Sequence, residues 1–190
     1  MHVWANTNFL PVCLLALGGL FTTPVFASEF SAQIKNASLE KQDDWYMLDA
    51  DVEYVLSPAA KEAIESSIPL VWHLKIQLKQ VRYFHDKTVI NLNYDYKIRY
   101  RALLNNYSVT NLNSKSEKKY PSLSEALDSL SHIRELKVIP VSALKKNKLY
   151  EAGIKLEFDK EQLPAPLRPT AYFDSEWNLS SDWYLWQLKK

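Results

Sequence analysis

The sequence predicts a mainly β (α+β) fold, an antiparallel β-sandwich or curled sheet with two short helices. Several stretches alternate apolar and polar residues with a period of two, which is the spacing of a strand with one buried face. Only two stretches show helical spacing. The chain has 190 residues, 47% of them hydrophobic, which is enough for one sizeable core. We therefore expect a single domain over residues 28–190.

Residues 1–27 are predicted to be a signal peptide. An apolar run over residues 9–21 is followed by Val25 and Ala27 at the positions that a signal peptidase recognises, so we expect cleavage after Ala27. Removing 27 of 190 residues leaves 163, and none of these is cysteine because Cys13 is the only one. This predicts export to the periplasm of a Gram-negative bacterium, without disulfides or thiol chemistry. The alternative is an uncleaved N-terminal anchor, and after cleavage no membrane span is expected.

The strand predictions depend on alternation. Residues 44–57 alternate most regularly, with apolar residues on one face and three acids on the other. The polar residues 41–44, "KQDD", predict a hairpin turn to an earlier strand over residues 29–40. Two long strands are expected to meet near "RYFHDK", residues 82–87. The remaining strand predictions are residues 70–79, 90–100, 105–112 and 149–158.

Two stretches carry helix signals. In "SPAAKEAIESS", Ser57 is the expected N-cap and Pro58 the first helical residue. In "SLSEALDSLSHIREL", residues 122–136, Ser122 and Glu125 form a capping box. Its predicted apolar face consists of Leu123, Ala126, Leu127, Leu130 and Ile133. Both helices are expected to connect strands of a β framework.

The C-terminal part combines prolines with tryptophans. "LPAPLRP", residues 163–169, predicts a stiff connector, and the alternative is a polyproline segment that a partner recognises. In "DSEWNLSSDWYLWQL", residues 174–188, Trp183 and Leu185 alternate with other apolar residues. Both faces are then apolar, which predicts a final strand covered on both sides or closing a sandwich. We expect deletion of residues 177–190 to unfold the domain, whereas an exposed binding surface is the alternative.

Several chemistries have no signal in the sequence. Gly153 is the only glycine after the leader, so no glycine-rich phosphate loop or glycine-flanked nucleophilic serine is present. His73, His85 and His132 lack metal-ligand spacing and are interpreted as surface residues. The net charge of +1 predicts no general attraction to nucleic acid or anionic lipid. We therefore predict no catalytic residue, metal or cofactor.

Asp49, Asp51 and Glu53 share one strand face. Such acids can bind calcium or act as acid and base. We favour a solvated face, since basic residues lie on the corresponding faces of nearby strands and could form cross-strand ion pairs. These bases are Lys75, Lys79, Lys97 and Arg99.

"LPAPLRP" followed by "SEWNLSSDWYLWQL" resembles the C-terminal signature of an exported proteobacterial family, domain of unknown function 4390. The start "EFSAQIKNASLEKQDDWYMLDADVEYVLS", the strand "ESSIPLVWHLKIQL" and the helix "SLSEALDSLSHI" are similar to it as well. The resemblance implies a periplasmic or envelope protein, and no catalytic residue can be carried over. Family members are often encoded beside a membrane histidine kinase. The implied partner is therefore an envelope or inner-membrane protein such as a sensor kinase.

Three functional hypotheses follow. The leading one is a non-enzymatic interaction module that acts as an accessory to an envelope sensor or assembly system. In this hypothesis the C-terminal signature is structural or contacts a partner. Its candidate residues are Pro164, Pro166, Arg168, Trp177, Trp183 and Trp186. The second is a carrier for a lipid or other apolar ligand in a cavity lined by Trp72, Tyr94, Tyr96 and Tyr100. The third is an enzyme with a site around Asp49, Asp51 or His73.

Overall fold

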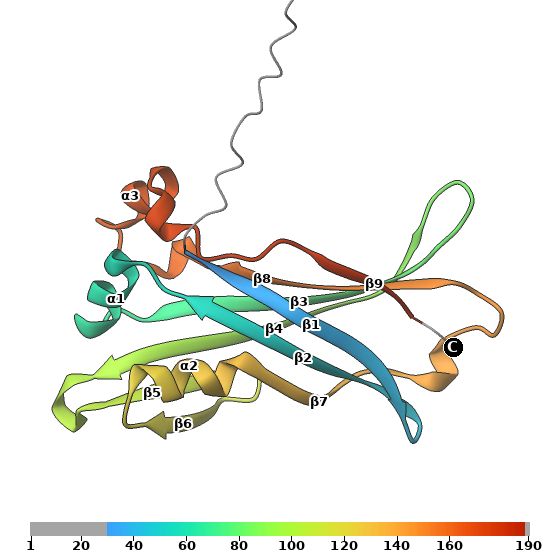
Figure 1. Cartoon of the computed structure of the whole chain (residues 1–190), viewed down its shortest axis with the longest axis horizontal. Coiled ribbons are helices and arrows are strands. Elements are labelled where there is room, and N and C mark those ends of the chain that lie inside the picture. The colour runs from blue at the N-terminus through green and yellow to red at the C-terminus, as the bar shows by residue number, and fades with distance from the viewer. Residues whose placement is uncertain (1–29, 189–190) are drawn as a thin grey trace, which may run out of the picture.

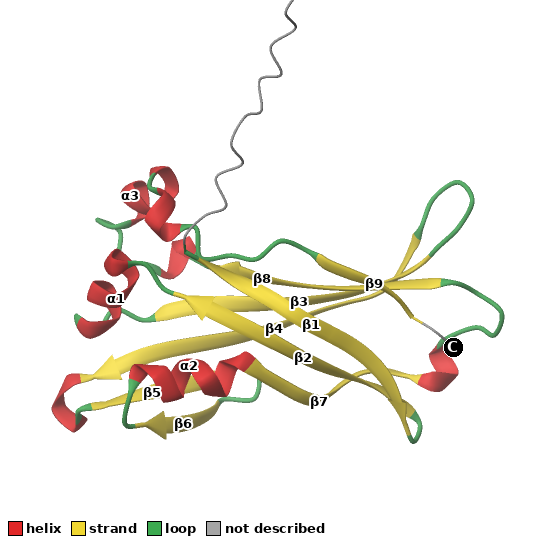
Figure 2. Ribbon diagram, in the orientation of Figure 1, coloured by secondary structure: helices red, strands yellow, loops and turns green. Residues whose placement is uncertain are grey.

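A computed structural model describes residues 30–188, so the predicted leader over residues 1–27 lies outside the described residues. Two antiparallel sheets pack face to face without closing into a barrel (Figure 1), and helices gather mainly at one end and one margin (Figure 2). This confirms the predicted mainly β fold class. The strands are β1 (Ser31–Gln42), β2 (Trp45–Val55), β3 (Leu70–Gln80), β4 (Lys87–Arg101), β5 (Asn106–Asn111), β6 (Ser116–Tyr120), β7 (His132–Pro140), β8 (Tyr150–Phe158) and β9 (Tyr184–Leu188).

The smaller sheet has the order β1-β2-β7. β1 and β2 form the predicted hairpin, in which Gln42 pairs with Trp45 and Asp43 takes a positive φ of 51° in the turn. The apolar face predicted for β2 is buried at Tyr46, Leu48, Ala50, Val52 and Leu56, and Tyr54 is half-buried. Alternation in the sequence therefore identified the inner face of this sheet correctly.

The larger sheet has the order β6-β5-β4-β3-β8-β9. β3 lies in the middle, paired with β4 and β8, and its five predicted inward residues are at most 1% exposed. They are Leu70, Trp72, Leu74, Ile76 and Leu78. The Trp72 ring packs between Tyr54 of the facing sheet, at 5.5 Å, and Phe158, at 5.3 Å. These aromatic contacts join the two sheets at the α1 end of the core.

Within residues 30–188, three α-helices and four 3₁₀ turns connect the strands. They are α1 (Pro58–Glu65), α2 (Leu123–Ser131) and α3 (Arg168–Phe173), with η1 (Ala102–Leu104), η2 (Val141–Ala143), η3 (Lys160–Gln162) and η4 (Ser175–Trp177). The predicted caps of α1 and α2 are present: Ser57 Oγ accepts from Ala60 N–H at 3.1 Å, and Ser122 Oγ accepts from Glu125 N–H at 3.2 Å. α2 contacts β2, β5, β6 and β7, so it covers one margin of the sandwich.

The α2 prediction was wrong at its C-terminal end, and β6 and β7 were not predicted. The helix stops at Ser131, and His132 begins β7, which pairs with β2. Ile133, predicted on the helix, lies in this strand and is half-buried there. Helical and strand spacing both place Ile133 against the core, and the hydrogen bonds offered by β2 decide between them.

α3 corrects the prediction of two helices. The segment "LPAPLRP" does not run as a stiff connector into the final strand, because its last residues begin α3. Pro169 is tolerated in the first turn, where its missing N–H needs no partner, and Ala171 is fully buried and anchors the helix.

Candidate functional site

One end of the sandwich is formed by the β1–β2 hairpin and by the connection between β7 and β8. Val141 N–H donates to the carbonyl oxygen of Asp44 at 2.8 Å, which holds the start of the connection against the hairpin turn. Farther along, Lys145 N–H donates to the hydroxyl of Tyr150 at 2.9 Å. These contacts keep a nine-residue connection close to the sheet edges, and a pocket lies between it and the hairpin.

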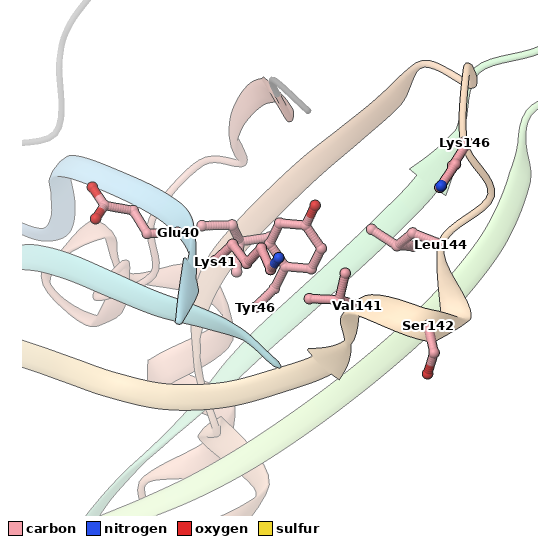
Figure 3. A pocket seen from close by; sticks show the side chains of 8 residues that line it. Glu40, Lys41, Tyr46, Val141, Ser142, Leu144 and Lys146 are labelled. Atoms are coloured by element: carbon pink, nitrogen blue, oxygen red, sulfur yellow. The ribbon is translucent and has the colours of Figure 1, made fainter. Parts of the chain in front are cut away.

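This end pocket has a volume of about 750 Å³. Its buried wall consists of Leu39, Tyr46 and Leu144, which are 7%, 3% and 5% exposed. Figure 3 shows Val141 and Leu144 pointing toward the Tyr46 ring from the opposite side of the pocket. The pocket therefore has an apolar interior between two loops.

Polar groups of the end pocket lie at its rim. Lys41 and Lys146 are exposed lining residues, and they bring two ammonium groups to the mouth. Figure 3 shows the Glu40 carboxylate and the Ser142 hydroxyl pointing away from the Tyr46 ring. Within residues 30–188 no hydrogen bond to the Tyr46 hydroxyl is present, so this group can bond to a ligand. An apolar interior with cations at the mouth suits an amphipathic anion.

The proline–tryptophan signature does not form one site. Pro164 and Pro166 are exposed in the loop before α3. Arg168 Nε donates to the carbonyl oxygen of Leu163 at 2.8 Å, and its Nη1 lies 3.6 Å from Glu161 Oε2. Trp177 is 3% exposed and stacks on Phe158 at 6.1 Å. This part of the signature therefore makes structural contacts at the α3 end of the molecule, away from the end pocket (Figure 1).

The remaining tryptophans correct the predicted two-sided burial of the last strand. β9 is the edge strand of the larger sheet, and its inner residues are covered: Leu188 is buried, and Trp186 is half-buried and 5.8 Å from the Tyr184 ring. On the outer side, Trp183 is 38% and Leu185 is 50% exposed. No element among residues 30–188 covers this outer side, so β9 has one dry face and one exposed apolar face.

The acidic face of β2 is solvated, but the predicted ion-pair partners were wrong. Asp51 is bound by Arg134 of β7, and Glu53 pairs with Lys35 of β1 at 2.6 Å. β2 belongs to the smaller sheet, whereas the bases proposed as partners lie on the larger one. Hydrogen bonds from Arg134 and Asn36 lower the pKa of Asp51. The carboxyl is therefore held ionised by a structural pair.

His73 lies on the outer face of β3, as predicted, but it has two close partners. Its Nδ1 is 2.7 Å from Asp95 Oδ1, and its Nε2 is 3.0 Å from Asp159 Oδ2. Burial of the ring opposes protonation, yet the hydrogen bonds to both carboxylates outweigh it and raise the pKa of His73. Because both ring nitrogens are engaged, neither is free to activate a hydroxyl as a general base.

The cavity expected near Trp72 and Tyr96 is filled. Trp72 is 1% exposed, and its Nε1–H donates to the carbonyl oxygen of Leu179 at 3.0 Å. The space beside Tyr96 measures about 30 Å³, the size of a water molecule. The larger space lies instead at the end pocket, whose residues the sequence interpretation did not select. Tyr46 lies on the predicted buried face of β2, whereas Leu39 is out of phase with Ala32 and Ile34 and reaches the core because of the register shift after Ile34. Only the approach of the β7–β8 connection makes the two residues a pocket wall.

A family model described as "Domain of unknown function (DUF4390)" matches residues 29–187. No curated protein and no solved structure matches the chain. Across residues 30–188, no three His, Cys, Asp or Glu side chains gather in an arrangement that could hold a metal ion. Over the same range, none of the helices has the length and hydropathy of a membrane span.

Proposed function

Because the chain belongs to the DUF4390 family, whose function is unknown, we propose from its own geometry that it is a non-catalytic binding protein of the periplasm. Its ligand is an amphipathic anion, an apolar chain with one acidic group, bound in the end pocket. This is the carrier hypothesis, placed at a different site from the one that the sequence suggested.

The end pocket is the observation that carries this proposal. Its volume of about 750 Å³ lies within the range of small-molecule sites, roughly 300–1,000 Å³. Leu39, Tyr46 and Leu144 offer the apolar wall, while Lys41 and Lys146 offer charge for the acidic group. An apolar chain gains about 0.8 kcal/mol for each CH₂ group that it buries, so the wall favours ligands with several such groups.

The chemistry of the lining favours binding over catalysis. The serine hydroxyl and the carboxylate of the lining both point away from the Tyr46 ring, so they are not aimed at a ligand lying against it (Figure 3). His73, with its two carboxylate partners, lies on the outer face of β3 and is not a lining residue.

The test uses laurate as the probe and native mass spectrometry with calorimetric titration as the readouts. Leu144→Trp fills the pocket and is expected to weaken laurate binding about tenfold or more, because the indole occupies the volume that the chain needs. Leu149→Trp is the matched control, since Leu149 is 67% exposed in the same connection and does not line the pocket. Equal laurate binding by wild type and Leu144→Trp would refute the end-pocket assignment.

A second candidate function is contact with an envelope protein, such as a sensor kinase, through the outer side of β9. The supporting observation is the exposed pair Trp183 and Leu185 on an edge strand. In-cell crosslinking in the host should recover the same partner with wild type and with Leu103→Ser/Leu104→Ser, an exposed apolar pair in the β4–β5 turn. Loss of that partner only in Trp183→Ser/Leu185→Ser supports this candidate, and its retention there removes it.

A further inference from the structure

The loop between β3 and β4 exposes two adjacent aromatic rings. Tyr83 is 94% and Phe84 is 85% exposed, and their rings meet edge to face with centroids 4.9 Å apart. Figure 1 shows this loop projecting beyond the ends of both sheets, at the end of the molecule that carries η2. Exposed aromatic pairs of this kind mark surfaces that contact another apolar phase or partner.

This aromatic loop is ordered at its base and joined to the β7–β8 connection. Arg82 N–H donates to Asp86 Oδ1 at 3.1 Å, which closes the loop. Val81 N–H donates to the carbonyl oxygen of Leu149 at 3.0 Å. Val81 and Leu149 are 41% and 67% exposed, so the two loops share an apolar surface behind the aromatic rings.

Positive charge is concentrated in the same two loops together with Lys87, the first residue of β4. Residues 81–87 and 141–149 contain five Lys or Arg and one acid, a formal charge of +4, whereas the whole chain carries +1. The acid is Asp86, whose carboxylate already accepts the Arg82 N–H. Asp43 and Asp44 lie in the neighbouring β1–β2 turn, next to Val141. The basic residues of these segments are Arg82, Lys87, Lys145, Lys146 and Lys148.

We infer that this basic aromatic end docks on an anionic lipid bilayer. Tyr83 and Phe84 enter the boundary between headgroups and acyl chains, where aromatic rings are favoured, and the basic side chains contact lipid phosphates. The projecting shape of the loop suits entry into a deformable surface. Lysines are attracted to a diffuse anionic surface without needing paired geometry.

The inference goes beyond the proposed function, because Tyr83, Phe84 and Leu149 do not line the end pocket. Lys146 belongs to both surfaces, so the end pocket adjoins the proposed docking surface.

The experiment is vesicle cosedimentation with the protein purified from its host in the form made there, its intact mass measured first. Binding is compared between vesicles of mixed phosphatidylglycerol and phosphatidylcholine and vesicles of phosphatidylcholine alone. The ratio of the two affinities is the readout, since an apolar N-terminal run would bind both lipids alike. Wild type is expected to prefer the anionic vesicles about tenfold or more, and added salt should reduce this preference.

Three variants locate the binding surface. Tyr83→Ser/Phe84→Ser should weaken binding to anionic vesicles about tenfold or more, and Lys145→Gln/Lys148→Gln should lower the ratio between the two lipids. Leu103→Ser/Leu104→Ser, with side chains 100% and 55% exposed in the β4–β5 turn, should change neither value. Wild type without preference for anionic vesicles overturns the inference, as does unchanged binding by Tyr83→Ser/Phe84→Ser. If the same loops bind a protein partner instead, wild type should show no preference for anionic vesicles.

Discussion

Removal of residues 177–190 should unfold the domain, because this segment completes the core. Trp177, Leu179 and Leu188 are 3%, 1% and 6% exposed. The same segment holds the carbonyl oxygen that accepts the indole N–H of Trp72, at 3.0 Å. It also continues the edge of β8, since Ser181 Oγ accepts from Leu156 N–H at 2.8 Å and Ser181 N–H donates to the Leu156 carbonyl oxygen at 2.8 Å.

The lost stability follows from these contacts. Three large buried side chains contribute about 1.5–3 kcal/mol each, or about 5–9 kcal/mol together. Leaving the buried Trp72 Nε1–H without its acceptor costs about 1–3 kcal/mol more. Domains of this size have a net stability of about 5–15 kcal/mol, so the truncated chain is expected to be unfolded at 25 °C.

The assay is thermal unfolding followed by near-UV circular dichroism, with two single substitutions of the same residue type as a graded comparison. Trp177→Ala should cost about 3–5 kcal/mol because the side chain is buried against Phe158. Trp183→Ala should cost less than about 1 kcal/mol, since its ring is 38% exposed. A truncated protein with the melting temperature of wild type would refute the reasoning, and so would Trp183→Ala costing more than Trp177→Ala.

Further predictions concern local contacts. Because the pKa of His73 is raised in the folded protein, its two carboxylate contacts stabilise the fold fully below about pH 6.5, the pKa of the unfolded state. This stability is lost as the pH rises through the pKa of the folded state. His73→Gln should therefore lower the melting temperature more at about pH 5 than at about pH 9, and an equal loss at both would contradict the pairing. Ser57→Ala should lower the free energy of unfolding, measured in urea, by about 1–2 kcal/mol, and Ser122→Ala should lower it by about 0.5–1 kcal/mol. The difference is expected because the Ser57 cap is fully buried, and the reverse order would contradict this reason. A Cβ at Gly153 would lie 2.5 Å from Leu185 Cδ2 and 3.1 Å from Gln77 Nε2, so Gly153→Ala should cost about 1 kcal/mol in wild type and less in a Leu185→Ala background, where only the Gln77 contact remains. A double-mutant cycle without coupling between Gly153→Ala and Leu185→Ala would disprove the contact.

The sequence alone specified the buried faces of the long strands β2 and β3. Alternation with a period of two identifies directly the residues that face the core, and the inward residues predicted for β3 are all buried. The starts of α1 and α2 were equally accessible, because a cap such as Ser57 bonds to a backbone group three residues away. The resemblance to the DUF4390 family was confirmed over residues 29–187 for the same reason, since a family signature is itself a sequence pattern.

Only the tertiary structure decided how separate segments meet. Asp51 carries no sign in the sequence of its partner Arg134, because that pairing depends on β7 lying beside β2. The one-sided cover of β9 likewise follows from its place at a sheet edge, which its apolar composition does not specify.

The end pocket and the basic aromatic end are the clearest examples of features that depend on how separate segments meet. Net charge is a sum over the sequence, and a value of +1 conceals two segments, residues 81–87 and 141–149, that together carry +4. They form one surface because β3–β4 and β7–β8 both turn at the same end of the sandwich, where Val81 is hydrogen-bonded to Leu149. Local patterns specify which side chains are buried, whereas strand order and register specify which exposed side chains become neighbours.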